Sequence, residues 1–544
     1  MNIAEQDERL RDEVRMASCA GQPAAGPTPE FVASVGVPSL HWLARNALPR
    51  PVGGSAKAAD ADPGADANAN ANANANDGLG AGEREQLVRN ARDCLSDLAA
   101  LSSLRRPLGE LPWATVEAFE QRLLAALDAL LALGQPLCPG SSVGWHVLDE
   151  VQRYWAEAFV PDPGREFARA FTLCCIDGDD AVAAALLGLR QAPSSVYPAF
   201  RDALVLAPNP HIGRFLTELL PSASGDLLLL LLEILRQRRE ATFSSLVPLS
   251  AHLDAAVLAA ASRGLGYVAC SEGVLRTLHR IIEQEEDDVV AVEAATSLLL
   301  HGDTGGLSLA RGRLEDVALL SEKGRLGLLR LIALAGAASD LDLVRQSIAP
   351  TVRDAELMGW FGHVGLLPWL LATLREANAA RESTRPWPHP LEIAVSHALF
   401  RITGAPLHDA EDSGLPYESA TLPALSAELW AQWWQEKSSS MPVGVKLRFG
   451  QLYEPRATLD ELLGDSFAAW RADGALELGI VVGASRFEPG DWVHRQRSVL
   501  GALKTELDAV CGGYVPGRFP ADQLARRPIY AGEPRDPGQR NAGR

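Results

Sequence analysis

The sequence predicts an all-α protein, in which helical hairpins stack into an α-solenoid between an N-terminal helical region and a small C-terminal helical cap. Three observations lead to this class. Apolar residues recur at helical spacing over most of the 544 residues, with very little of the alternation typical of strands. A short block that ends in leucine recurs at nearly constant spacing. Hydrophobic residues make up 47% and charged residues 22% of the chain, which supplies enough apolar surface for a long core.

A composition break divides the N-terminal part of the chain. We expect a helical segment over 1–48 and a disordered insert over 49–82, because the Ala-Asn alternation at 67–76 contains no large apolar side chain to offset its ordering entropy. Residues 83–160 predict an N-terminal helical region. Its segments Glu83–Leu104 and Thr115–Leu133 should form an antiparallel pair.

The repeats occupy residues 161–403. The final leucines of five matching blocks are separated by about 30, 34 and 35 residues and then by about 65, which corresponds to two repeats. The blocks are Leu230–Leu235, Ala260–Leu265, Ala294–Leu299, Leu329–Leu334 and Ala394–Leu399. Each is followed by a break and a second apolar helix, so the unit is a helical hairpin and the array a solenoid of short HEAT-like repeats. A compact irregular helical domain is the alternative.

The C-terminal part begins with an acidic loop over 404–423, which is rich in Gly and Pro. A cap over 424–525 and a disordered tail over 526–544 follow. Within the cap, apolar residues alternate over Val443–Gly450 and the alternation stops at Gly450, which predicts a short hairpin or an extended clip. Helical pattern then resumes.

Charge and hydropathy limit the function classes. The 50 Lys and Arg residues against 69 Asp and Glu residues give a net charge of −19, which disfavours nucleic acid as a partner. The longest aliphatic run, Leu227–Leu232, is far shorter than the ~20 residues that cross a bilayer, and the N-terminus lacks the apolar core of a signal peptide. We therefore expect a cytoplasmic protein without membrane insertion, and no cofactor.

One sequence match to a catalytic motif has a simpler explanation. Gly140–Gly144 fits the pattern G-x-S-x-G with Ser142 at its centre, but a helix stands where the nucleophile elbow requires a strand. A loop that caps the following helix accounts for these residues. We expect no catalytic residue.

Two further motifs resemble ligand sites. The acidic run over 177–180 lacks the glutamate of a calcium loop, since the twelfth position is Gly188, and helix capping by Asp179 or Asp180 explains it. The glycines of Gly359–Gly365 have no flanking strand or basic partner for a phosphate, and close helix packing explains them. We predict no metal site.

Two clusters are candidates for binding a partner. An acidic cluster consists of Glu283, Glu285, Glu286, Asp287 and Asp288. An aromatic cluster consists of Trp430, Trp433 and Trp434, whose spacing places them on one helical face. A solvated turn between repeats and a face that seals the end of the solenoid are the alternatives. If the clusters bind, we expect a protein with basic character on the concave face of the repeats over 164–376.

Several segments occur in the order found in a known family. They are Ser39–Arg45, the helix Leu123–Gly134, the repeat blocks, Ala398–Gly404, Leu429–Trp434 and Gly444–Gly450. Together they resemble a family of uncharacterised bacterial HEAT-repeat proteins that are often encoded near type VI secretion components. The resemblance implies an accessory or adaptor whose partner is a secretion component or an effector, and it assigns no catalytic residue. The alternative is an enzyme, either a hydrolase that uses Ser142 or a lyase like some bilin-chromophore HEAT proteins.

Overall fold

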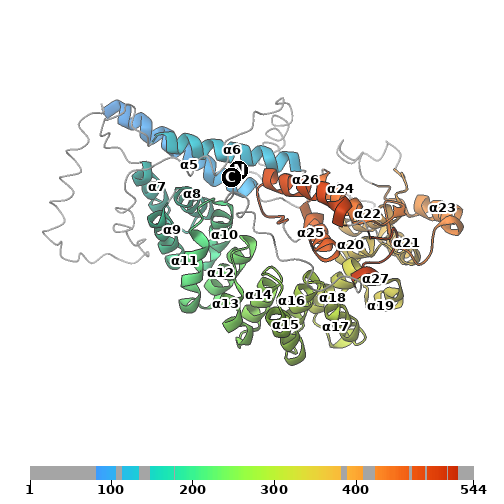
Figure 1. The fold of residues 1–544 in the computed structure, drawn as a ribbon. Helices are drawn as coiled ribbons and strands as arrows, with labels where there is room; N and C mark the ends of the chain where they lie inside the picture. The colour runs from blue at the N-terminus through green and yellow to red at the C-terminus, as the bar shows by residue number, and fades with distance from the viewer. Residues whose placement is uncertain are drawn as a thin grey trace, which may run out of the picture. The chain divides into compact units, whose positions relative to one another are not determined.

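The computed structural model describes residues 81–105, 113–133, 147–176, 178–380, 389–408, 423–464, 468–483, 487–510 and 513–524. Most of these residues lie in helices (Figure 1). The predicted all-α class is therefore confirmed for the described part of the chain. The expected segments 1–48 and 526–544, and most of 49–82 and 404–423, lie outside the described residues.

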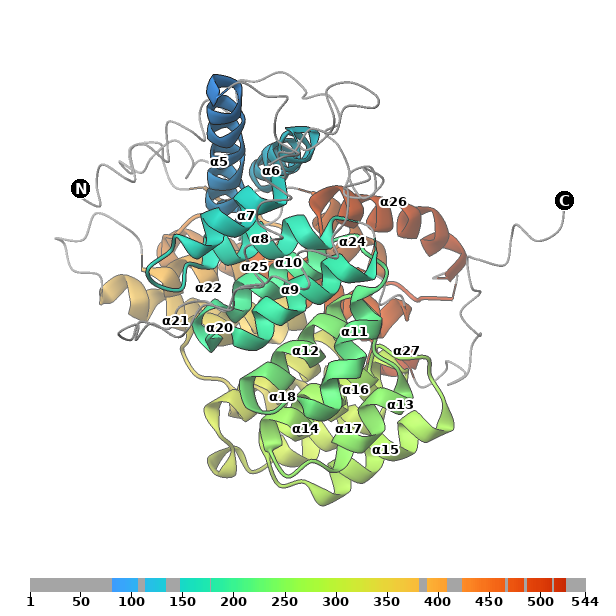
Figure 2. The same cartoon turned by 90° about the vertical axis from the view of Figure 1, so that its left-hand side faces the viewer.

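The described residues form two compact units, one of the residues up to 240 with 490–496 and one of residues 241–489 with those from 497 onward. In the first unit, α5 packs against α6 and α8, while α8, α10 and α12 pack in that order (Figure 2). The helices of this unit are α5 (Ala81–Leu104), α6 (Trp113–Leu133), α7 (Val147–Ala156), α8 (Pro163–Cys174), α9 (Asp179–Gln191), α10 (Tyr197–Leu206), α11 (Ile212–Leu219) and α12 (Gly225–Gln237), with 3-10 turns at Ser194–Val196 and Leu220–Ser222.

The second unit contains a longer series of helices. They are α13 (Phe243–Leu246), α14 (Ala255–Leu265), α15 (Glu272–Gln284), α16 (Asp288–Leu300), α17 (Gly305–Leu314), α18 (Glu322–Ala335), α19 (Leu341–Ser347), α20 (Val352–Phe361), α21 (Leu367–Ala379), α22 (Pro390–Thr403), α23 (Ala427–Lys437), α24 (Pro455–Leu463), α25 (Ala468–Val482) and α27 (Ala521–Leu524). Helix α26 (Val493–Val510) begins in the first unit and continues in the second. Short 3-10 turns lie at Val247–Ala251, Val317–Leu319, Ala338–Asp340, Val364–Leu366 and Ser438–Ser440.

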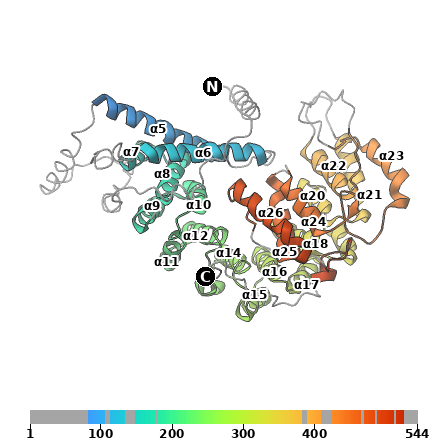
Figure 3. The ribbon, with the colours of Figure 1, turned by 45° about the horizontal axis from the view of Figure 1, so that its top comes forward.

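Within the second unit the even-numbered helices pack in the order of the chain. Helix α14 contacts α16, α16 contacts α18, α18 contacts α20 and α20 contacts α22 (Figure 3). The intervening helices α15, α17 and α21 pack beside the even-numbered helix that follows each of them. Inside this unit the helices of the repeat region therefore pack in chain order, but α15 packs mainly against α16, which follows it, and not against the block helix α14 that precedes it.

Side-chain caps define where several of these helices begin. Ser271, Asp287 and Ser321 are the N-cap residues of α15, α16 and α18, and each side chain accepts a hydrogen bond from a backbone N–H in the first turn. Such a bond satisfies a donor that has no partner inside the helix. At the other end, Gly362 and Gly404 follow α20 and α22 in the left-handed conformation, which glycine adopts without steric cost.

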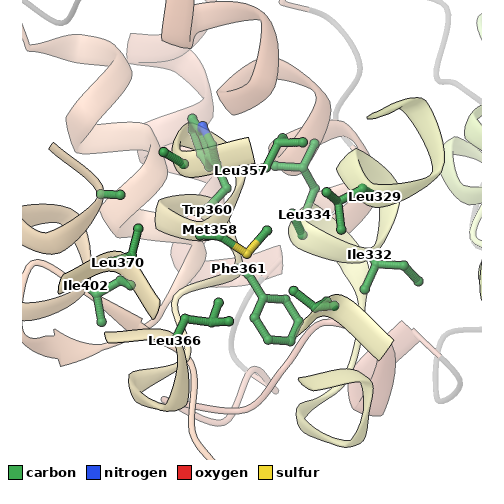
Figure 4. Packing of buried hydrophobic residues seen from close by; sticks show 14 of the residues in the cluster. Leu329, Ile332, Leu334, Leu357, Met358, Trp360, Phe361, Leu366, Leu370 and Ile402 are labelled. Atoms are coloured by element: carbon green, nitrogen blue, oxygen red, sulfur yellow. The ribbon is translucent and has the colours of Figure 1, made fainter. Parts of the chain in front are cut away.

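The leucines that end the repeat blocks are all buried, with at most 1% of their surface exposed. They are Leu235, Leu265, Leu299, Leu334 and Leu399. Figure 4 shows part of the second unit's core, where Trp360 and Phe361 of α20 belong to the same cluster of buried residues as Leu334 of α18. The recurring leucine is therefore a core position of the helix that carries it.

The predicted hairpin near Gly450 is confirmed. Strands β1 (Leu447–Arg448) and β2 (Gln451–Leu452) are antiparallel, and Leu447 lies opposite Leu452. The two residues of the turn, Phe449 and Gly450, have φ angles of 51° and 75°. Two successive positive φ values are the geometry of the two-residue turns that suit the twist of paired strands.

Candidate functional site

The acidic cluster lies in the turn between α15 and α16, and its members have different surroundings. The side chains of Glu283 and Glu286 are exposed, and that of Glu285 is half-buried. Asp287 caps α16, because its Oδ1 accepts hydrogen bonds from the backbone of Val289 and Val290 at 2.8 and 3.0 Å. This carboxylate stabilises the helix itself.

Asp288 is also engaged inside the protein. Its Oδ1 lies 3.1 Å from Nη1 of Arg313, and its Oδ2 accepts a hydrogen bond of 2.9 Å from the backbone of Ser321, the cap of α18. Arg313 also donates to the carbonyl groups of Glu285 and Glu286. Among the described contacts, none involves the carboxylates of Glu283, Glu285 or Glu286. These three side chains therefore form the part of the cluster that is available to a partner.

The aromatic cluster lies on α23. Trp430 is 1% exposed, and its indole N–H donates a hydrogen bond of 2.6 Å to the carbonyl of Ala424. Trp433 and Trp434 are partly buried against the core of the second unit, and the rings of Trp430 and Trp433 meet edge to face at 6.2 Å. This face packs largely inward, which favours the sealing role over an exposed anchor.

Among the other motifs, Ser142 lies outside the described residues. The capping role predicted for Asp179 or Asp180 is corrected, because the N-cap of α9 is Gly178 and both aspartates lie in the first turn. There a negative charge still complements the helix dipole. Asp179 pairs with Arg214 at 2.6 Å.

Close helix packing explains Gly359, whereas Gly362 is explained by its left-handed backbone and by the hairpin beside it. A Cβ atom on Gly359 would lie 3.1 Å from the Cα of Ala398, so α20 and α22 approach through this residue. A Cβ atom on Gly362 would lie 2.5 Å from the carbonyl oxygen of Leu447, where the hairpin crosses the end of α20. Gly362 also has a φ of 70°, so this position requires glycine, whereas a side chain at position 359 would force its neighbours to shift.

The hairpin segment, which we call the clip (residues 443–453), is bound to the ends of two helices. The backbone N–H of Leu447 donates to the carbonyl of Gly362 at 2.8 Å, and that of Phe449 donates to the carbonyl of Arg401 at 2.6 Å. The last carbonyl groups of a helix have no partner within it. The clip supplies these partners to α20 and α22.

A cluster of buried charges joins the clip to three helices, and the sequence motifs did not predict it. Its members come from α22, the clip, α24 and α25, and they are Arg401, Lys446, Arg448, Glu461 and Glu477. The side chains of Lys446, Arg448 and Glu477 have no exposed surface. Since an unpaired buried charge is very costly, the contacts among these groups decide whether the arrangement is stable.

Glu477 is at the centre of this cluster. Its carboxylate lies 2.7 Å from Nζ of Lys446 and accepts two hydrogen bonds of 3.0 Å from Nη2 of Arg448. Glu461 accepts from Nη1 of Arg448 at 3.0 Å and also pairs with Arg401. Each carboxylate therefore binds two cations, which is the pairing that buried charges require.

Aromatic rings cover the cations. The guanidinium groups of Arg401 and Arg448 lie 3.8 and 4.5 Å from the ring centre of Trp360, and Nζ of Lys446 lies 4.6 Å from that of Tyr453. The faces of these rings carry partial negative charge, so they stabilise cations that have lost their water.

The surroundings shift the pKa of these groups. Burial lowers the pKa of Lys446 to about 8, while Glu477 acts in the opposite direction. The pKa of Glu477 lies below its usual value because Arg448 and Lys446 outweigh the effect of its burial. The contact between Lys446 and Glu477 therefore favours the ionised form of each group.

A second buried carboxylate on the same face of α25 binds neighbouring helices. Asp473 is 1% exposed, and it contacts Nε of Arg330 on α18 at 2.6 Å and Nη1 of Arg353 on α20 at 2.8 Å. Helix α25 also packs against α16 and α18. The side of α18 and α20 that carries these arginines is thus covered by the chain's own C-terminal region.

The sequence nevertheless contains a signal for these groups. Asp473 and Glu477 are four residues apart on a helix, Ala468–Val482, that is otherwise dominated by small and apolar side chains. Lys446 and Arg448 occupy the intervening positions of the clip's apolar alternation. Acidic residues at i, i+4 on an apolar helix indicate a buried face that needs cations from elsewhere.

This cluster connects α22, the clip, α24 and α25 through ion pairs. Its charged groups pair with one another and are buried. Within the described ranges, no group of three or more His, Cys, Asp or Glu side chains could hold a metal ion. None of the helices in those ranges combines the length and apolarity needed to cross a membrane.

Comparison with known proteins adds no family. No protein-family model, no curated protein and no solved structure matches the chain.

Proposed function

We propose that this protein is a non-catalytic protein-binding scaffold or adaptor built on a HEAT-like solenoid. The observation that carries the proposal is the chain-ordered packing of helical hairpins in the second unit, from α14 to α22. Each hairpin contacts its neighbours in sequence, which is how solenoids generate an extended surface for partners.

Polar contacts at the repeat distance support the solenoid. Arg263 pairs with Glu293, 30 residues later, Arg311 pairs with Asp340, 29 residues later, and Arg325 pairs with Asp354, also 29 residues later. In each case a side chain of one hairpin binds the next hairpin. These separations of 29 or 30 residues are somewhat shorter than the 34 and 35 residues between the leucine blocks of this region, so each contact spans about one repeat.

The location of the binding surface that the sequence suggested has to be revised. A partner that lies along the side of α18 and α20 marked by Arg330 and Arg353 would meet α25, which already occupies it. Glu283, Glu285 and Glu286 lie at the end of α15 and in the turn before α16, and they take no part in the ion pairs of Arg330 and Arg353. We therefore place the partner, a protein with basic character, at the turn between α15 and α16.

The proposed setting is an accessory role in type VI secretion or effector loading, in the cytoplasm. Only the family resemblance of the sequence supports this setting. The partner would then be a secretion component or an effector.

The test is capture of partners by the full-length chain from the cytoplasm of its own cells, followed by identification by mass spectrometry. The key variant carries Glu283→Gln, Glu285→Gln and Glu286→Gln. The control carries Asp93→Asn, Asp97→Asn and Glu436→Gln, which removes three exposed charges elsewhere. We expect one basic protein to bind the wild type and the control equally, and the key variant several-fold less.

Equal capture by the key variant would remove the acidic turn from the mechanism. The absence of any specifically bound protein at physiological salt would contradict the scaffold function.

A further inference from the structure

A segment from late in the chain is built into the first unit. Residues 490–496, which we call the latch, join the described residues up to 240 in this unit. Trp492 has no exposed surface, and Val493 is 1% exposed. The indole N–H of Trp492 donates to the carbonyl of Leu206 at 3.0 Å, and its ring lies 5.9 Å from that of Phe171. The latch is thus held by specific contacts.

Two buried charges hold the backbone of the latch. Arg105, directly after α5, donates through Nη2 to the carbonyl groups of Gly490 and Asp491 at 2.9 and 3.0 Å. Glu120 of α6 accepts a hydrogen bond of 2.7 Å from the backbone N–H of Val493, the first residue of α26. That N–H has no acceptor within its own helix, so Glu120 serves as its cap.

Arg105 and Glu120 also pair with each other. Nε of Arg105 lies 2.9 Å from Oε1 of Glu120, and their side chains are only 10% and 3% exposed. The charged groups that act on Glu120 are Arg105 beside it and Asp491 of the latch. Burial raises the pKa of Glu120 to about 7, although Arg105 and the Val493 N–H oppose this.

We propose that residues 490–496 form a releasable latch, whose attachment to the first unit is controlled by the protonation of Glu120. When the latch leaves, Glu120 becomes exposed to water and its pKa returns toward the ordinary value of 4.5. The attached state then holds a proton that the released state gives up. By linkage, attachment is strongest below pH 4.5 and weakens as the pH rises through 7.

The test uses hydrogen exchange of the full-length chain at pH 5 and pH 8, with protection factors corrected for the intrinsic exchange rates. The reporters are the backbone amides of Val493 and Gln496, which donate to Glu120 and to the carbonyl of Trp492. Amides of α8 report global unfolding and should keep constant protection. We expect the reporter amides to lose protection by at least about tenfold between the two pH values.

Three variants test whether Glu120 causes the difference in protection between pH 5 and pH 8. Glu120→Gln keeps an acceptor for Val493 but cannot titrate, so the difference between pH 5 and pH 8 should disappear. His494→Gln removes the imidazole that stacks near Trp492, and it should keep the wild-type difference. Asp97→Asn, an exposed acid on α5, should also keep it.

Equal protection at both pH values in the wild type would overturn the proposal, whether or not the variants fold. It would also be overturned by a difference that persists in Glu120→Gln or that disappears in His494→Gln.

Discussion

Nζ of Lys446 lies 2.7 Å from Oε1 of Glu477, and neither side chain has any exposed surface. The lysine comes from the clip and the glutamate from α25, 31 residues later. The pair therefore connects two elements of the C-terminal region within the core of the second unit. Its effect on stability is directly measurable.

Removing the charge of Glu477 should strongly destabilise the second unit. Glu477→Gln leaves Lys446 and Arg448 buried without their shared counter-charge, a change that typically costs about 3–5 kcal/mol. Chemical denaturation followed by circular dichroism measures the loss. Glu436→Gln, on the exposed side of α23, is the matched control and should change the free energy of unfolding by less than about 0.5 kcal/mol. A similar stability of both variants would mean that the buried cluster is not needed.

The repeat leucines should behave as core residues. Leu334→Ala removes a side chain with no exposed surface, and we expect a loss of about 2–5 kcal/mol. Leu319 is in the same part of the chain but is 82% exposed, so Leu319→Ala should cost less than about 0.5 kcal/mol. The midpoint of urea unfolding provides the comparison. Equal effects of the two substitutions would contradict the assignment of the repeat core.

Substitutions in the acidic turn should differ in their effect on the stability of the protein. Asp287→Ala removes the cap of α16 and should cost about 0.5–2 kcal/mol. Glu286→Ala, at the neighbouring exposed position, should be nearly neutral. Thermal unfolding of the two variants tests this division. If Glu286→Ala were the more destabilising of the two, the structural role assigned to Asp287 would be wrong.

Acid should weaken the second unit through His397. Burial lowers the pKa of His397 to about 4, and Arg401 acts in the same direction. The unfolded chain, with a histidine pKa near 6.5, takes up the proton first, so this contribution to stability is complete above pH 6.5 and is lost as the pH falls to 4. Unfolding curves between pH 7 and pH 4 should show a smaller decline for His397→Gln than for the wild type. His252→Gln, at an exposed site, should match the wild type.

Local and periodic features of this protein were predictable from the sequence. The recurring leucines indicated the helices and their buried faces, because helical periodicity directly determines which side chains share a face. The turn at Gly450 was predictable for a similar reason, since its backbone geometry depends on a few adjacent residues. The burial of the repeat leucines confirms this level of prediction.

Only the tertiary structure decided how the charges are used. Asp473 pairs with Arg330, 143 residues earlier in the chain, and Glu120 caps an N–H that lies 373 residues later. No periodic pattern connects such residues, because their approach depends on the packing of whole helices rather than on local spacing. The same reason applies to Asp287 and Asp288, which the sequence does not distinguish from Glu283. In the folded protein Asp287 caps α16 and Asp288 pairs with Arg313. The sequence shows which residues carry a charge, but only the packing of the helices determines which of these charges are buried and paired.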